Sequence, residues 1–161
     1  MIGKDNNIRQ SVNDLLQQPF AYCIGDPECA AYSGCSFMFE GRFIKFRKAK
    51  VTPRKEGVFT TLWKRNAEGK TVPFDEKDPF DFYIIMAEQD SKTGYFIFSS
   101  QVLAQHGILS RTDTGGKRGF RLYPSWSSAG NRQAQKTQEW QLQYFIDESE
   151  SEKFRVLIQK Q

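Results

Sequence analysis

The chain has 161 residues, a length typical of one domain, and 39% of them are hydrophobic, including 14 phenylalanines for a core. Charged residues make up 26% and the formal net charge is +4, as in ordinary soluble proteins. Apolar runs stay well short of the roughly 20 residues that cross a bilayer, and residues 1–16 do not resemble a signal peptide. We therefore expect a cytoplasmic protein without a membrane partner.

Three cysteines lie six residues apart, at Cys23, Cys29 and Cys35. A soft metal site would want more thiols or imidazoles than three cysteines and one histidine offer, and a CxxC pair is missing. In a cytoplasmic protein we expect them to be reduced thiols near the core.

The first half of the chain predicts two helical segments followed by strands. Ser11–Gln18 is expected to be a short helix, capped by Ser11 and ended by Pro19, and Pro27–Tyr32 a further helical turn. Three strands follow, over Cys35–Glu40, Arg42–Val51 and Val58–Trp63.

The second half begins with Phe82–Ala87, an apolar run typical of a central strand covered on both faces. Ser99 or Ser100 would cap a helix that Gly107 ends. The remaining elements are a returning strand Tyr95–Phe98, a strand Phe120–Tyr123, a long helix Asn131–Ile146 and an edge strand Phe154–Ile158. This order predicts a single α+β domain with a central mixed β-sheet flanked by helices.

The positive charge is concentrated between Arg42 and Arg65. These 24 residues hold nine Lys or Arg and one acid, Glu56, for a net charge of +8, so the other 137 residues sum to −4. Four aromatic residues are interleaved with the charges: Phe43, Phe46, Phe59 and Trp63. Cations mixed with aromatic rings on extended chain can neutralise phosphates and stack on bases. The alternative is a solvated lysine-rich strand face of the kind that protects sheet edges.

Within this region, strict alternation places Lys48 and Lys50 on the same strand face as Ile44 and Phe46. Lysine is rarely buried without a partner. Either the strand bulges or simply ends after Phe46, or it leaves the core and delivers Lys48 and Lys50 into a cleft, with Lys50 facing phosphate.

Further basic residues follow in Trp63-Lys64-Arg65 and after the double glycine 115–116. The second group suits either a loop that clasps a nucleic-acid backbone or a flexible hairpin with incidental charge. The candidate phosphate contacts are Arg47, Lys50, Lys55, Lys64, Arg65, Lys117, Arg118 and Arg121. Tyr123, Trp126 or Trp63 would stack or wedge, although a buried core position is the commoner fate of tryptophan.

Metal-dependent nuclease chemistry would need carboxylates near a lysine. Acid-x-Lys triplets begin at Glu68, Asp75 and Asp90, and we interpret all three as surface turns. Glu28, before the first strand, is a better-placed acid, although an ordinary surface glutamate is the commoner case. His106, at a predicted helix end, is interpreted as a solvated residue favoured by the helix dipole, not as a catalytic base. The chain has no GxSxG, P-loop or GxGxxG motif.

Five long motifs occur in a distinctive order: FRKAKVTPRKEGVFTTLWKR, PFDEKDPFDFYII, GYFIFSSQVLAQHGILS, GKRGFRLYPSW and QAQKTQEWQLQYF. From about Glu28 to Phe145 the chain thereby resembles the MepB-like family of small bacterial cytosolic proteins. The resemblance implies one MepB-like domain over residues 1–161, with a restriction endonuclease-like fold of the PD-(D/E)xK group and a basic cleft facing nucleic acid, DNA rather than RNA. Lys50 would be the catalytic lysine and Glu28 the acid. The residue two before Lys50 is Lys48 instead of Asp or Glu, which argues against cleavage.

We therefore expect a cytoplasmic protein that binds DNA without sequence preference through a restriction endonuclease-like core, and whether that core retains catalysis stays open. One alternative is a Mg²⁺-dependent nuclease, with Glu28, Asp78 or Asp81 as metal ligands beside Lys50 and Mg²⁺ as its cofactor. A second is a binder of small anionic ligands such as nucleotides.

Overall fold

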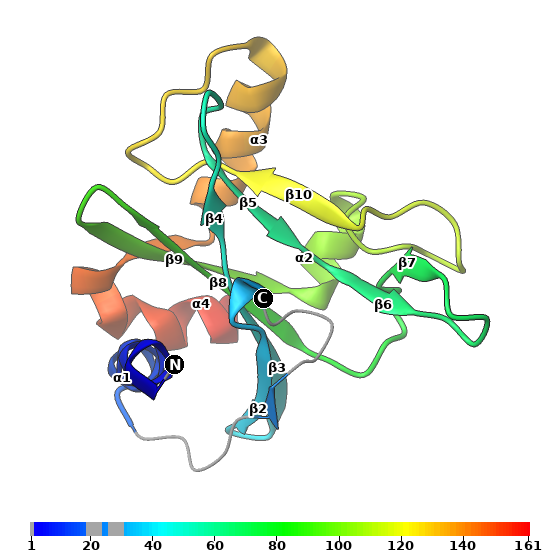
Figure 1. Ribbon diagram of the computed structural model, residues 1–161, viewed down its shortest axis with the longest axis horizontal. Coiled ribbons are helices and arrows are strands. Elements are labelled where there is room, and N and C mark those ends of the chain that lie inside the picture. Colours follow the sequence, from blue (N-terminus) through cyan, green and yellow to red (C-terminus); the bar gives the residue numbers. More distant parts are fainter. Residues whose placement is uncertain (1, 19–23, 26–30) are drawn as a thin grey trace.

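The centre of the molecule is a mixed β-sheet (Figure 1). The computed structural model describes residues 2–18, 24–25 and 31–161, and within them this sheet has six strands in the order β1-β2-β3-β8-β9-β11. The pairing of β3 with β8 is parallel and the other pairings are antiparallel. The strands are β1 (Ile24–Gly25), β2 (Cys35–Phe39), β3 (Arg42–Lys48), β8 (Phe82–Gln89), β9 (Lys92–Ser99) and β11 (Phe145–Asp147).

A smaller antiparallel sheet packs against the central one. In the described part of the chain it has the order β10-β5-β4, made by Gly119–Leu122, Val58–Thr61 and Lys50–Val51. A separate hairpin, β6 (Trp63–Arg65) and β7 (Thr71–Pro73), extends from its end. The chain therefore passes from the central sheet into the second sheet within the predicted strand Arg42–Val51.

Helices and the second sheet cover the two faces of the central sheet, and each face has its own apolar core. The helical segments are α1 (Ile2–Leu16), α2 (Ser100–Gln105), α3 (Arg132–Leu142), a 3₁₀ helix η2 (Glu148–Lys153) and α4 (Phe154–Lys160). Helices α1 and α4 pack on one face, and the second sheet with α2 packs on the other. The predicted α+β domain, with a central mixed sheet flanked by helices, is confirmed.

Strand β8 shows why the core has two halves. Ile84 and Met86 contact the core under α1, whereas Tyr83 and Ile85 contact the core under the second sheet. An almost continuous apolar run is what a strand buried on both faces requires. The prediction made from Phe82–Ala87 is therefore confirmed.

The predicted cap at Ser99 or Ser100 is confirmed. The Ser99 side chain accepts a hydrogen bond from the Val102 amide at the start of α2, and Asn131 does the same for Ala134 in α3. Helix α1, in contrast, is longer than expected, so Ser11 lies inside it and does not cap it.

Two predictions in the C-terminal region are wrong. Helix α3 ends at Leu142, and Phe145 belongs instead to β11, where it pairs with Phe96 of β9. The Phe145 ring packs over Gly94, which has no side chain on that face. Phe154–Ile158 is part of helix α4, not an edge strand. Phe154 and Ile158 are 1% and 3% exposed while Val156 is 60% exposed, which is helical and not alternating burial.

Cys35 is disulfide-bonded, so the expectation of three reduced thiols is wrong for this residue. Cys23 and Cys29 lie outside the described residues, as does most of the predicted helical turn Pro27–Tyr32. Among the helices in the described part of the chain, none is long and apolar enough to span a membrane.

Candidate nucleic-acid interface

The two sheets are joined at Ala49. The parallel register of β3 with β8 is continuous, from Ile44 opposite Phe82 to Lys48 opposite Met86, so alternation persists to Lys48 without a bulge. The buried Ala49 donates its amide to the Met86 carbonyl at 2.9 Å. The next residue, Lys50, already pairs with β5 of the second sheet.

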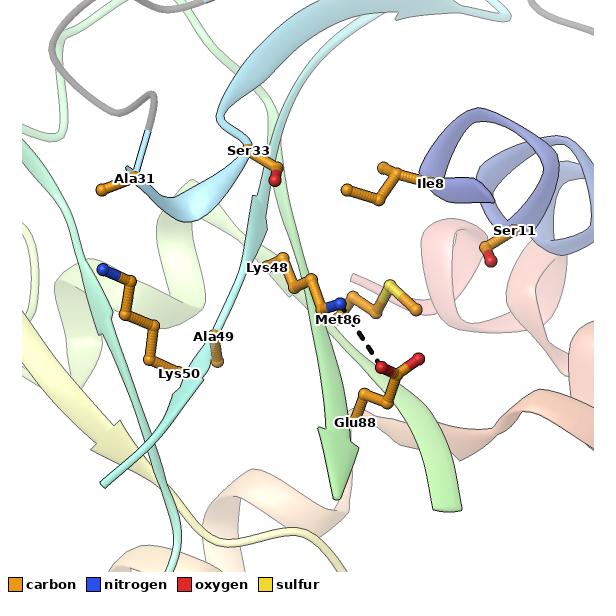
Figure 2. A pocket seen from close by; sticks show the side chains of 9 residues that line it. All are labelled: Ile8, Ser11, Ala31, Ser33, Lys48, Ala49, Lys50, Met86 and Glu88. Atoms are coloured by element: carbon orange, nitrogen blue, oxygen red, sulfur yellow. Dashed lines mark hydrogen bonds and ion pairs between the residues drawn. The ribbon is translucent and has the colours of Figure 1, made fainter. Parts of the chain in front are cut away.

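Lys48 and Lys50 line a pocket of about 320 Å³ beside α1 and the ends of β3 and β8 (Figure 2). The Lys48 ammonium group lies 3.4 Å from a carboxylate oxygen of Glu88. The Lys50 ammonium group lies 4.6 Å from the centre of the Tyr32 ring, a cation–π contact. The strand thus leaves the core and brings both lysines to the lining of a pocket, but their side chains point to opposite sides (Figure 2). The prediction that they share one face is wrong for Lys50, because the chain changes sheets at Ala49.

On the second sheet, Lys50, Phe59 and Arg121 form one cross-strand row. Phe59 is the direct partner of Lys50 on one side and of Arg121 on the other. Direct partners in antiparallel strands project to the same face. That face is the outer one, because their neighbours Val58 and Leu122 are fully buried.

The outer face continues along the chain into β6. Leu62 is 1% exposed and points to the core, so alternation brings Trp63 outward again. The Arg65 guanidinium lies 5.4 Å from the centre of the Trp63 ring, and that of Arg121 lies 6.0 Å from the centre of the Phe59 ring. We call these outward-facing residues the basic–aromatic strip: Lys50, Phe59, Trp63, Arg65 and Arg121.

Arg121 also fixes the loop between β4 and β5. Its Nη1 donates to the Thr52 hydroxyl at 2.8 Å and to the Glu56 carbonyl at 3.1 Å. The exposed Lys55 lies in this loop. The loop closes on Gly57, whose φ of +81° suits glycine and whose Cβ, if present, would meet the Leu122 carbonyl oxygen. Lys55 is thus held next to the strip at one end.

Lys117 and Arg118 lie next to the strip at its other end. Both are exposed, and the Arg118 carbonyl accepts a hydrogen bond from the Leu62 amide at 2.8 Å. Lys64 points away from Trp63 and forms an ion pair with Asp78 at 2.6 Å. Lys64 is therefore less available to a phosphate than the exposed Lys117 and Arg118.

The prediction that Arg47 contacts phosphate is wrong, because Arg47 is buried. It is 2% exposed, and its Nη1 donates to the Phe46 carbonyl at 2.8 Å. Alternation turns Arg47 away from Lys48, toward the second sheet that covers this face. A buried guanidinium cannot contact a phosphate on the surface, so Arg47 is removed from the interface.

Two candidate stacking residues, Tyr123 and Trp126, follow the double glycine 115–116, and hydrogen bonds within the protein fix their positions. The Tyr123 amide donates to the buried Gln141 side chain at 2.9 Å. Trp126 donates from Nε1 to Gln89 at 3.2 Å, and its ring packs edge-on against Phe145 with centres 5.7 Å apart. Both residues are half-buried, and the contacts of the Trp126 side chain are those of a packing residue.

The candidate metal ligands lie at the wrong end of the sheet for Lys50. The Asp81 carboxylate accepts a hydrogen bond from the Phe43 amide at 2.8 Å. Phe43 lies five residues before Lys48 on strand β3. At about 3.3 Å per residue, that places Asp81 roughly 17 Å from Lys48. Asp78 is held by Lys64 and by the Asp75 amide, and Glu28 lies outside the described residues. Among the described side chains, no group of three metal-ligating residues is present.

Asp75 corrects one of the surface-turn interpretations. Its carboxylate is buried and accepts hydrogen bonds from the Ser110 hydroxyl at 2.7 Å and from the amides of Lys77 and Asp113. These donors, the Lys77 amide above all, hold the pKa of Asp75 below its ordinary value. The carboxylate therefore ties two loops together. The triplets at Glu68 and Asp90 do lie in turns.

His106 ends helix α2 but is not simply solvated. Its ring stacks on Trp140 with centres 3.8 Å apart and planes 6° from parallel. Desolvation lowers the pKa of His106, whereas a helix dipole alone would raise it.

Sequence reasoning missed Tyr32. Its ring meets Lys50 only because the fold brings the start of β2 beside the end of β3. Phe59 was noted as one of several interleaved aromatic residues, and its place in the row depends on the pairing of β4, β5 and β10. Alternation within Val58–Thr61 was the available indication that Phe59 faces outward.

Comparison with known proteins agrees with this description of the fold. Residues 26–147 match the family model described as MepB-like. The crystal structure of MepB is similar with a TM-score of 0.76 and 31% identity, covering 78% of this chain and 85% of that one. A bacterial homing endonuclease, I-Ssp6803I, is similar with a TM-score of 0.47 and 12% identity over 89% of this chain and 93% of that one, a level that says nothing about activity. The curated proteins contain no match to the sequence.

Proposed function

The chain belongs to the MepB-like family, and we propose that it binds nucleic acid through the basic–aromatic strip, DNA in preference to RNA and without a required base sequence. The preference for DNA follows the family resemblance. The binding mode is argued from the side chains of this chain.

The row Lys50–Phe59–Arg121 is the observation that carries the proposal. An outward ring with a cation on each neighbouring strand offers a base a stacking surface and offers its phosphates a partner on either side. Trp63 and Arg65 repeat the pair farther along the same chain. From Phe59 to Arg65 the strip spans roughly 20 Å of extended backbone. The sequence from Val58 to Arg65 contains no acid, so a polyanion meets little repulsion along it.

The position of the carboxylates favours binding over cleavage. Asp78 and Asp81 are engaged at the far end of the central sheet, and Lys48 stands where a nuclease would need an acid beside Lys50. Two carboxylates close to the scissile phosphate are what position Mg²⁺ and its water. Binding is therefore expected to be independent of Mg²⁺.

Fluorescence anisotropy with single-stranded DNA, duplex DNA and RNA of one sequence tests the proposal. In EDTA, the logarithm of the association constant should fall linearly with the logarithm of salt concentration, by about 0.7 per phosphate contacted on a single strand. A second DNA sequence should bind within about twofold of the first, because stacking tolerates every base. The proposal would be refuted by a lack of binding at low salt, or by an association constant that does not change with salt concentration.

Incubation of supercoiled plasmid with Mg²⁺ or Mn²⁺ separates binding from nuclease activity. The plasmid should stay intact while its mobility shifts with protein concentration. Nicking that EDTA inhibits and Lys50→Ala abolishes would establish the nuclease instead.

A further inference from the structure

The pocket that contains Lys48 lies next to the basic–aromatic strip. Its lining includes Lys48 and Lys50 from the β3–β4 strand and the hydroxyl-bearing Ser11 and Ser33 from α1 and the segment before β2. Figure 2 shows Lys48 directed toward Glu88 and Lys50 directed to the other side, beside Ala31. Apolar side chains complete the lining: Ile8, Ala49 and Met86.

The charge of the pocket favours an anion. It contains two ammonium groups and one carboxylate, Glu88. The contact between Lys48 and Glu88 is 3.4 Å long, and the two side chains are 35% and 48% exposed, so this ion pair is weak. Lys50 rests on the Tyr32 ring, which holds its side chain in place without neutralising its charge. An entering anion can therefore replace Glu88 as the partner of Lys48, while Lys50 adds positive charge on the other side of the pocket.

The pocket and the strip share Lys50. Lys50 is the direct cross-strand partner of Phe59, and neighbouring strands lie about 4.8 Å apart. A base stacked on Phe59 would accordingly place its own phosphate within reach of Lys50. A volume of about 320 Å³ is at the small end for ligand sites and suits one compact group.

We propose that this pocket holds a terminal phosphate monoester of the nucleic-acid strand that lies on the strip. The inference rests on the proposed function and adds a preference for phosphorylated ends. A phosphate monoester carries close to two negative charges at neutral pH, whereas an internal phosphodiester carries one. Lys48 favours the monoester, and Glu88 limits how tightly it binds.

The test compares one short DNA strand in three forms: with a 5′-phosphate, with a 3′-phosphate and with neither, each carrying an internal fluorophore. One of the two phosphorylated forms should bind about tenfold more tightly than the unphosphorylated form, the gain expected of one charge-assisted contact. Lys48→Gln should remove this gain and leave binding of the unphosphorylated strand unchanged. Glu88→Gln should enlarge it, because Lys48 then has no competing carboxylate. Lys136→Gln, on the exposed side of α3, is the matched control and should preserve it.

Two results would overturn the inference. If all three strands bind the wild-type protein equally and Phe59→Leu weakens them equally, the strip binds nucleic acid but the pocket does not select ends. If a free nucleoside monophosphate binds as tightly as the phosphorylated strand, the pocket is a free-nucleotide site. Lack of binding by every strand would refute the proposed function itself, which keeps the two failures distinguishable.

Discussion

Phe59 and Arg121 are direct cross-strand partners on the outer face of the second sheet, with the guanidinium 6.0 Å from the ring centre. Arg121 is at the same time the hydrogen-bond donor that holds the loop after β4. One arginine thus organises the loop that carries Lys55 and places a positive charge beside the ring. The aromatic surface and its flanking charge are consequences of the same strand register.

Replacing Phe59 with leucine should separate stacking from charge. Leucine keeps much of the apolar contact area in the sheet but offers no flat ring, and base–aromatic stacking contributes about 1–3 kcal/mol. We expect DNA affinity to fall about 5- to 150-fold with an unchanged dependence on salt. Anisotropy titrations at several salt concentrations measure both quantities. A changed salt dependence with undiminished affinity would argue against stacking on Phe59.

Lys50→Gln should give the complementary result. Removing one phosphate contact should weaken binding to all DNA sequences alike and reduce the slope of log affinity against log salt by about 0.7 on single strands. Lys50 is exposed, so the melting temperature should change little. Lys136→Gln, which removes the same charge from α3, provides the control for net charge. Equal effects of the two substitutions would mean that DNA senses only the overall charge.

Arg47→Ala should act on stability and not on binding. The Arg47 side chain is buried, so its truncation leaves a cavity and removes the hydrogen bond to Phe46, at a cost of about 2 kcal/mol or more. Chemical denaturation measures this loss. DNA affinity, measured where the variant is folded, should equal that of the wild type. Weaker binding by fully folded protein would return Arg47 to the interface.

The contrast between Arg47 and Lys48 shows where prediction from sequence ends. Both belong to one basic segment, and alternation correctly assigns them to opposite faces. Their different fates depend on the second sheet, which covers the face of Arg47 and leaves the end of the other face beside a pocket. That sheet is built by β4, β5 and β10, which are about 70 residues apart in the chain at their extremes, and such pairing leaves no local pattern.

Features decided locally were predicted well. The apolar run of β8 and the cap at Ser99 depend on neighbouring residues alone.

In Phe154–Ile158, apolar residues at every second position predicted a strand. The same residues also satisfy helical spacing between Phe154 and Ile158, and packing against the central sheet selects the helix. Short apolar segments of this kind are ambiguous until their partner surface is known.

Asp75 should make stability depend on pH at the acid end. The hydrogen bonds to its carboxylate lower the folded-state pKa below the ordinary value of 3.8. The unfolded chain then takes up the proton first, so the stabilisation is complete above pH 3.8 and is lost as pH falls through the folded pKa. Asp75→Asn places an amide against the Ser110 hydroxyl and two backbone donors, and we expect a loss of about 1–3 kcal/mol at neutral pH. In urea denaturation series, the difference between wild type and Asp75→Asn should be largest at neutral pH and shrink below about pH 4. Glu139→Gln, an exposed acid on α3, should show a small and pH-independent difference, and equal pH profiles for the two variants would contradict the role given to Asp75.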